Sequence, residues 1–195
     1  MSSFTKTKTV LCVATFACVL AQNAAAQSLT LIGNTGYAQK CFEASNVAAR
    51  IQSASFEDLQ NCTKAVDHES LSRADLAATY VNRGIIYAAL SRFDNAQSDY
   101  QKAMSMDDSI PAIYLNRGNL WFVTQQLDKA IEDYSKSLEL DVNQPHVAFL
   151  NRGLAYEYKG NLTQARKDYQ TSLGLRPEWE SAKLKLARVE EKLAN

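Results

Sequence analysis

Histidine and cysteine, two of the residues that most often hold metals, are scarce in this chain. There are only two histidines, His68 and His146, and His68 has no second histidine four residues further on, as a zinc helix motif requires. A glycine-rich phosphate loop and a GxSxG nucleophile turn are also missing. We therefore predict no catalytic residues, no metal site and no cofactor, and we expect a protein that is not an enzyme.

Neither sign of charge is in excess, and no basic block occurs. The 21 lysines and arginines balance 21 aspartates and glutamates. Because nucleic acids and anionic membranes attract clusters of positive charge, neither is expected as the main partner. Beyond the N-terminal segment, no hydrophobic stretch is long enough to anchor the chain, so no stable membrane insertion is expected.

The N-terminal segment has the organisation of a secretory signal. Lys6 and Lys8 precede an apolar stretch at 10–20, which is too short to span a bilayer comfortably. Small residues at 24–26 then supply a cleavage site. We predict that this segment is cleaved and that the mature protein is periplasmic or secreted. A lipoprotein acceptor at Cys18 is the weaker alternative, because the preceding residues lack the usual leucine.

Only two cysteines, Cys41 and Cys62, remain beyond the signal. Two cysteines in an exported chain favour one disulfide bond, and no CxxC redox motif is present. Closing a loop of about 20 residues stabilises a fold by up to about 3 kcal/mol on the chain-entropy account. We therefore predict a structural disulfide.

A threefold internal repeat is the most informative feature of the sequence. Gly84, Gly118 and Gly153 are 34 and 35 residues apart, and each ends a similar stretch of an aromatic residue, Val or Leu, Asn and Arg. A period of this length is typical of helix–turn–helix solenoid units. A second signature follows each glycine at a constant offset. It consists of Ala96 with Asp99-Tyr100, Ala130 with Asp133-Tyr134, and Ala165 with Asp168-Tyr169.

With this period and these residues, the chain is similar to tetratricopeptide-repeat (TPR) proteins. The resemblance implies an all-α, right-handed solenoid of antiparallel helix pairs with a C-terminal capping helix. Pairing of two helices in the N-terminal part would also place Cys41 beside Cys62. The expected segments are a signal at 1–26, a flexible arm at 27–36, a degenerate helix pair with the disulfide at 37–76, repeats at 77–110, 111–145 and 146–179, and the capping helix at 180–195.

The capping helix is amphipathic, with Ala182, Leu186 and Val189 on one stripe and charged residues around it. We expect this stripe to cover the last repeat, as terminal units of solenoids require. A coiled-coil dimer is the alternative, but barely two heptads are too few to favour it. We therefore expect a monomer.

The repeat glycines need a packing reason, because glycine in a helix interior costs about 1 kcal/mol relative to alanine. We expect the two helix backbones of each unit to approach closely there, opposite the alanine of the second signature. The tyrosines of that signature are expected to fill the wedge between neighbouring units.

An arginine precedes each repeat glycine, and an aspartate follows the arginine sixteen residues later. We favour an ion pair that ties together the two helices of each unit. The alternative is an acidic-peptide site made of three arginines, against which the aspartates argue. The three sets are Arg83 with Asp99, Arg117 with Asp133, and Arg152 with Asp168.

The resemblance implies a concave groove, faced by residues two before, one after and four after each repeat glycine. Asn82, Asn116 and Asn151 form the first set, and their carboxamides can pair with a peptide backbone whatever its side chains. Alternatively, these asparagines cap or bridge neighbouring helices and contact no ligand. Phe122 is the expected exposed anchor. The other expected groove residues are Ile85, Asn119 and Leu154.

These features predict an exported TPR protein that binds an extended or helical peptide segment of another protein, as a scaffold or adaptor. The inner-face positions lack the lysines and arginines of TPRs that grip a C-terminal carboxylate, so that binding mode is not predicted. One alternative is a chaperone-like holder of non-native exported proteins, which would protect several unrelated clients. Another is a structural subunit of an envelope complex that uses its convex face.

Overall fold

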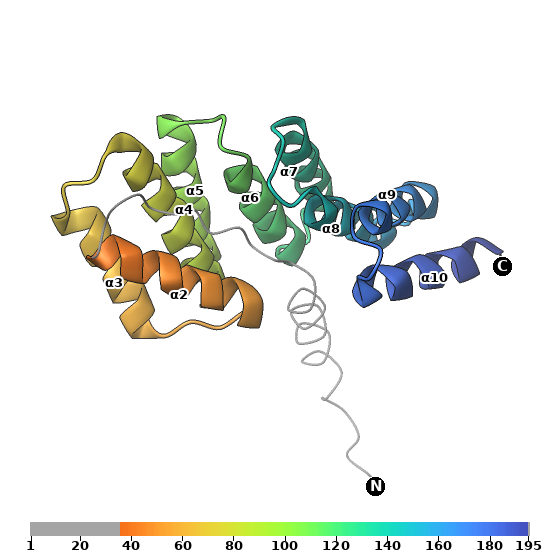
Figure 1. Cartoon of the computed structure of the whole chain (residues 1–195), viewed down its shortest axis with the longest axis horizontal. Coiled ribbons are helices and arrows are strands. Elements are labelled where there is room, and N and C mark those ends of the chain that lie inside the picture. The colour runs from red at the N-terminus through yellow and green to blue at the C-terminus, as the bar shows by residue number, and fades with distance from the viewer. Residues whose placement is uncertain (1–35, 195) are drawn as a thin grey trace, which may run out of the picture.

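The protein is described here by a computed structural model that covers residues 36–194, and every regular element in this range is an α-helix (Figure 1). The predicted signal and nearly all of the predicted arm lie outside these residues. None of the helices in the described range has the length and hydropathy needed to cross a bilayer. The helices are α2 (Tyr37–Ile51), α3 (Phe56–His68), α4 (Arg73–Ala89), α5 (Phe93–Met106), α6 (Pro111–Val123), α7 (Leu127–Glu139), α8 (Pro145–Tyr158), α9 (Leu162–Leu175) and α10 (Glu180–Ala194).

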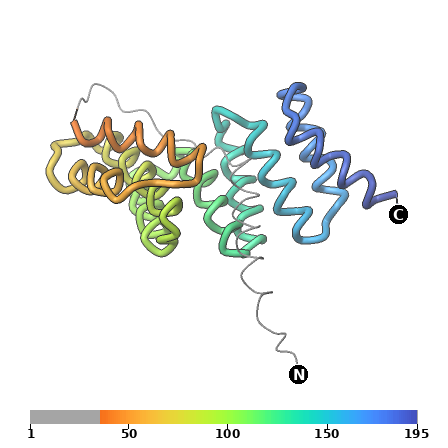
Figure 2. Tube along the Cα trace, turned by 90° about the horizontal axis from the view of Figure 1, so that it is seen from below, coloured from red at the N-terminus to blue at the C-terminus, as the bar shows by residue number. Residues whose placement is uncertain are grey.

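Consecutive helices pack as pairs, and the pairs stack side by side along one axis (Figures 1 and 2). The pairs are α2 with α3, α4 with α5, α6 with α7, and α8 with α9, and α10 packs against α9 at the end of the row. The first helices of neighbouring pairs also contact one another: α2 contacts α4, α4 contacts α6, and α6 contacts α8. This arrangement confirms the predicted all-α solenoid and its C-terminal capping helix.

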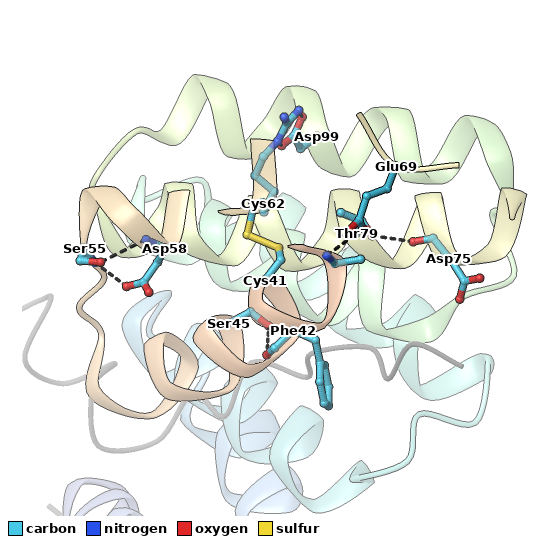
Figure 3. Close-up of a disulfide and its surroundings, with 12 residues drawn as sticks. Cys41, Phe42, Ser45, Ser55, Asp58, Cys62, Glu69, Asp75, Thr79 and Asp99 are labelled. Atoms are coloured by element: carbon cyan, nitrogen blue, oxygen red, sulfur yellow. Dashed lines mark hydrogen bonds and ion pairs between the residues drawn. A yellow bond between two sulfur atoms is a disulfide. The ribbon is translucent and has the colours of Figure 1, made fainter. Parts of the chain in front are cut away.

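Several helices begin where their sequence specifies a start. At α3, the Ser55 hydroxyl accepts a hydrogen bond from the Asp58 N–H at 3.1 Å, and the Asp58 carboxylate accepts one from the Ser55 N–H at 2.7 Å (Figure 3). Ser72 caps α4 with its hydroxyl. Pro111 and Pro145 stand at the starts of α6 and α8, where a backbone N–H would have no partner within the helix.

The N-terminal pair is held together by covalent and polar contacts. Cys41 of α2 and Cys62 of α3 form a buried disulfide with an S–S distance of 2.05 Å (Figure 3). The carboxylate of Glu69, directly after α3, accepts the N–H groups of Tyr37 and Ala38 at 2.6 and 3.0 Å. This negative charge caps the start of α2, where the helix dipole is positive.

Each repeat glycine makes room for the tyrosine ring of its own unit. A Cβ atom added to Gly84 would lie 2.5 Å from Cε1 of Tyr100, a distance that real Cβ atoms essentially never show. We expected alanine opposite these glycines, and the structure corrects this: the nearest atoms belong to tyrosine. The ring atoms Cδ1 and Cε1 lie against the helix backbone at the glycine. The corresponding distances are 2.7 Å for Gly118 to Tyr134 and 2.8 Å for Gly153 to Tyr169.

The core is divided along the solenoid axis. One apolar cluster joins α2 to α6, a second joins α6 to α8, and a third joins α8 to α10. Each helix pair therefore buries its apolar face against its neighbours, and the inner face of the solenoid is set by contacts between units.

Candidate functional site

An arginine–aspartate pair cross-links the two helices of each repeat. In the first repeat, Arg83 Nε donates to Asp99 Oδ2 at 2.6 Å and Arg83 Nη2 donates to Asp99 Oδ1 at 2.9 Å. Both aspartate oxygens are used in this two-pronged pairing, and the aspartate is buried. These arginines thus serve the fold, and they do not form an open acidic-peptide site. The same two bonds join Arg117 to Asp133 and Arg152 to Asp168.

The predicted asparagine row is not an open surface. Asn82, Asn116 and Asn151 are all buried. The Asn151 Nδ2 donates to Asn119 Oδ1 at 2.9 Å, which joins α8 to α6. Asn151 therefore bridges neighbouring helices, as the alternative for these asparagines predicts. The expectation of an exposed row of carboxamides is corrected, because the neighbouring helices cover them.

Phe122 is not an exposed anchor. Only 1 % of its surface is exposed, and its ring packs edge-on against Tyr158 with ring centres 5.4 Å apart. Leu154 is also completely buried. The prediction for Phe122 is wrong because Tyr158, from the next repeat, covers the ring.

Three of the predicted groove residues do meet at a cavity that opens to solvent. Ile85, Asn116 and Asn119 line a pocket of about 120 Å³ where α2, α4 and α6 come together. No lining residue carries a charge. We call this the inner pocket. Its remaining walls are Ala48 and Ala49 of α2, Gln52 directly after α2, Ala88 and Ala89 of α4, Ser91 of the following turn, Phe93 and Tyr100 of α5, and Leu120 and Val123 of α6.

The repeat pattern does not predict the wall of the pocket that α2 supplies. The degenerate N-terminal pair has no repeat glycine to mark which of its residues face inward. The adjacent alanines Ala48 and Ala49 were the available signal, because small side chains on a helix leave space beside it. Their partners across the pocket, Ala88 and Ala89, are also small.

The three repeat tyrosines differ in what their hydroxyl groups bind. Tyr134 donates to Asn119 Oδ1 and Tyr169 donates to Glu157 Oε2, each at 2.9 Å. The Tyr100 side chain is also buried, with 1 % exposure, but its hydroxyl makes no hydrogen bond with any residue of the described range. Burial, and secondarily the charge of Asp99, raise the pKa of Tyr100 well above its ordinary value, so the hydroxyl stays protonated.

At the C-terminal end of the inner face, a buried carboxylate fastens the capping helix. Glu157 of α8 is 8 % exposed and accepts hydrogen bonds from Tyr169, from Arg188 at 2.8 Å and from Lys192 at 2.9 Å. Burial by itself would raise the pKa of Glu157, but the three donors outweigh it and the pKa is lowered. Because Arg188 and Lys192 belong to α10, the charge of Glu157 holds α10 against α8.

The two histidines occupy ordinary structural positions. His68 is exposed in the last turn of α3, and the His146 ring packs edge-on against Trp179 with ring centres 5.2 Å apart. Burial, with a smaller contribution from Arg176, lowers the pKa of His146. Between residues 36 and 194, no group of three His, Cys, Asp or Glu side chains is placed to hold a metal ion.

Comparison with known proteins identifies the repeated unit. Family models described as "tetratricopeptide repeat" match residues 111–144 in one case and residues 77–109 and 147–178 in another. Together these matches cover about half of the chain. No curated protein matches the sequence.

Solved structures with a similar fold include two TPR domains and one further protein. The first TPR of Spaghetti (RPAP3), bound to the HSP90 peptide SRMEEVD, is 27% identical, with 61% of this chain and 94% of that chain covered and a TM-score of 0.58. For the first TPR domain of human RPAP3 the identity is 26%, the coverage 62% and 94%, and the TM-score 0.59. Pseudomonas aeruginosa pilF, at 17% identity, shows likeness of fold alone, with coverage of 81% and 68% and a TM-score of 0.69.

Proposed function

Because the chain belongs to the tetratricopeptide-repeat family, we propose that it binds a peptide segment of another protein on its inner face, as a scaffold or adaptor. Stacked helix pairs form an extended surface that repeat proteins use for binding. A similar structure, the first TPR of Spaghetti, is bound to an HSP90 peptide. These likenesses support a role in binding rather than in catalysis.

The observation that carries the proposal is the inner pocket. It lies on the side of the solenoid where the first helices of three successive units meet, and it opens to solvent. Ligand sites are typically concave and largely apolar, with a few polar groups that fix orientation. At about 120 Å³, the pocket has room for a side chain of a peptide and not for a folded domain.

We also propose that the protein is exported and works in the periplasm or outside the cell. The signal-like composition of residues 1–26 supports this location. The buried disulfide supports it independently, because such bonds persist mainly in oxidising compartments. The expected partner is therefore another exported protein.

Capture of partners from envelope extracts tests the proposal with two matched variants in one helix. Ala88→Glu puts a charge into the uncharged pocket, whereas Ala74→Glu puts the same side chain on the exposed start of α4. We expect one stoichiometric partner with the wild type and with Ala74→Glu, and its loss with Ala88→Glu. Circular dichroism and thermal unfolding check that both variants are folded.

Two results would contradict the proposal. Retention of the same partner by folded Ala88→Glu would exclude the inner pocket as the binding site. Suppression of the aggregation of several unrelated proteins, without a defined partner, would instead identify a chaperone-like holder.

A further inference from the structure

The side chain of Tyr100 lines the inner pocket, and no residue between 36 and 194 supplies an acceptor for its hydroxyl group. In the second repeat, the acceptor for the tyrosine is Asn119, one residue after the glycine. In the third repeat it is Glu157, four residues after the glycine. The corresponding residues of the first repeat are Ile85 and Ala88, which have no side-chain acceptor. The Tyr100 hydroxyl is therefore left without an acceptor where the pocket lies.

Asn119 does not supply the missing acceptor. Asn119 lines the same pocket, but its Oδ1 already accepts two hydrogen bonds, from Tyr134 and from Asn151. A carbonyl oxygen has two lone pairs, so this atom has no capacity left for Tyr100. A tyrosine hydroxyl that lines an open pocket and has no acceptor among the described residues is available to donate to a ligand.

We propose that the Tyr100 hydroxyl donates a hydrogen bond to a main-chain carbonyl oxygen of the bound segment, and that a neutral aliphatic side chain of the segment fills the inner pocket. This inference rests on the proposed function, and it specifies the chemistry of the segment. Burial raises the pKa of Tyr100, so the hydroxyl stays protonated and can donate to an acceptor of the ligand.

The size and charge of the pocket select the side chain. Its volume of about 120 Å³ is somewhat below that of an engineered apolar cavity of about 150 Å³ that binds benzene. One side chain of the size of leucine, isoleucine or valine suits this space. A carboxylate or ammonium group would lose its hydration among uncharged walls with no opposite charge to pair with. The segment is therefore neutral at the residue that enters the pocket.

Titration with a small neutral probe, followed by amide chemical shifts in NMR spectra, tests the proposal. The probe is N-acetyl-leucine methylamide, which combines an aliphatic side chain with main-chain carbonyls. We expect its shifts to concentrate on the pocket walls in α2, α4 and α6. The corresponding aspartate probe is expected to bind at least tenfold more weakly.

Two tyrosine variants separate binding from stability. Tyr100→Phe removes no internal hydrogen bond, so its melting temperature should match the wild type while its affinity for the leucine probe falls about three- to tenfold. Tyr169→Phe loses the bond to Glu157, so its melting temperature should fall while its affinity is unchanged. A third variant, Ile85→Asn, copies Asn119 and gives Tyr100 an internal acceptor. This variant should lower the affinity for the leucine probe to a similar extent as Tyr100→Phe.

Equal affinity of wild type and Tyr100→Phe for the leucine probe would overturn the proposal. So would the absence of shifts at the pocket walls, or equal affinity for the aspartate probe. If partner capture still depends on Ala88 in any of these cases, the proposed function stands and only the chemistry assigned to the segment fails. If partner capture is also insensitive to Ala88→Glu, the proposed function fails as well.

Discussion

At the scale of single residues, the contact between glycine and tyrosine sets how closely the two helices of each repeat approach. The tyrosine ring lies against the glycine backbone at a distance that leaves no space for a methyl group. Close packing of this kind makes interiors sensitive to the addition of one carbon atom. The same substitution should therefore have opposite effects at a packed glycine and at an exposed one.

Gly118→Ala and Gly174→Ala are the matched pair. A Cβ atom at Gly118 would meet the Tyr134 ring, whereas nothing lies within 4 Å of a Cβ at Gly174. Overpacking costs about 1–3 kcal/mol, which outweighs the gain of about 1 kcal/mol in helix propensity. We expect Gly118→Ala to lower the free energy of unfolding by up to about 2 kcal/mol and Gly174→Ala to leave it unchanged or raise it. Urea denaturation measures both, and a stabilised Gly118→Ala would contradict the packing argument.

Glu157 makes stability depend on pH. Its pKa is lowered in the folded state from an ordinary value of 4.5, so the unfolded chain binds its proton more tightly. The stabilisation is therefore complete above the unfolded pKa and is lost as the pH falls through the lower, folded value. Thermal unfolding between pH 7 and pH 3 should show a steeper acid loss for the wild type than for Glu157→Gln.

At neutral pH, Glu157→Gln should be less stable than the wild type by about 1–2 kcal/mol, because the partners Arg188 and Lys192 are half exposed and screened. The control is Glu191→Gln, an exposed glutamate on α10. Parallel acid curves for wild type and Glu157→Gln would show that Glu157 does not contribute to the pH dependence.

At the scale of helices, the N-terminal helix pair contributes both to the stability of the fold and to the walls of the inner pocket. The disulfide ties α2 to α3, and α2 supplies Ala48 and Ala49 to the inner pocket, with Gln52 directly after it. A covalent tie within the pair therefore helps to keep one wall of the pocket in place. The two cysteines are 21 positions apart in the sequence.

Replacing Cys41 and Cys62 by serine should destabilise this pair locally. The loss is expected to reach up to about 3 kcal/mol, the chain-entropy estimate for a loop of this size. Hydrogen exchange should increase over α2 and α3 and remain unchanged over α8 and α9, because contacts in a solenoid are between neighbours. Affinity for the leucine probe should fall as well. Uniformly faster exchange over the whole chain would contradict this local effect.

At the scale of the whole molecule, the repeat period was enough to predict helix pairs and their stacking into a solenoid. The sixteen-residue spacing also predicted the partners of Arg83, Arg117 and Arg152, because both ends of each pair recur with the unit. The period could not show which inner-face residues are open. Phe122 is covered by Tyr158 of the next repeat, and the pocket depends on α2, which lacks the repeat pattern.

The central claim is that another protein is held at the inner pocket, and site-specific photo-crosslinking in cells tests it most directly. A photoreactive residue replaces Val123, which lines the pocket, or Gln101, an exposed residue of α5 outside it. We predict one dominant crosslinked partner from position 123 and none from position 101, with the position 123 product reduced by Ala88→Glu. Crosslinking of the same partner from position 101 alone would contradict the account and place binding on the outer helices.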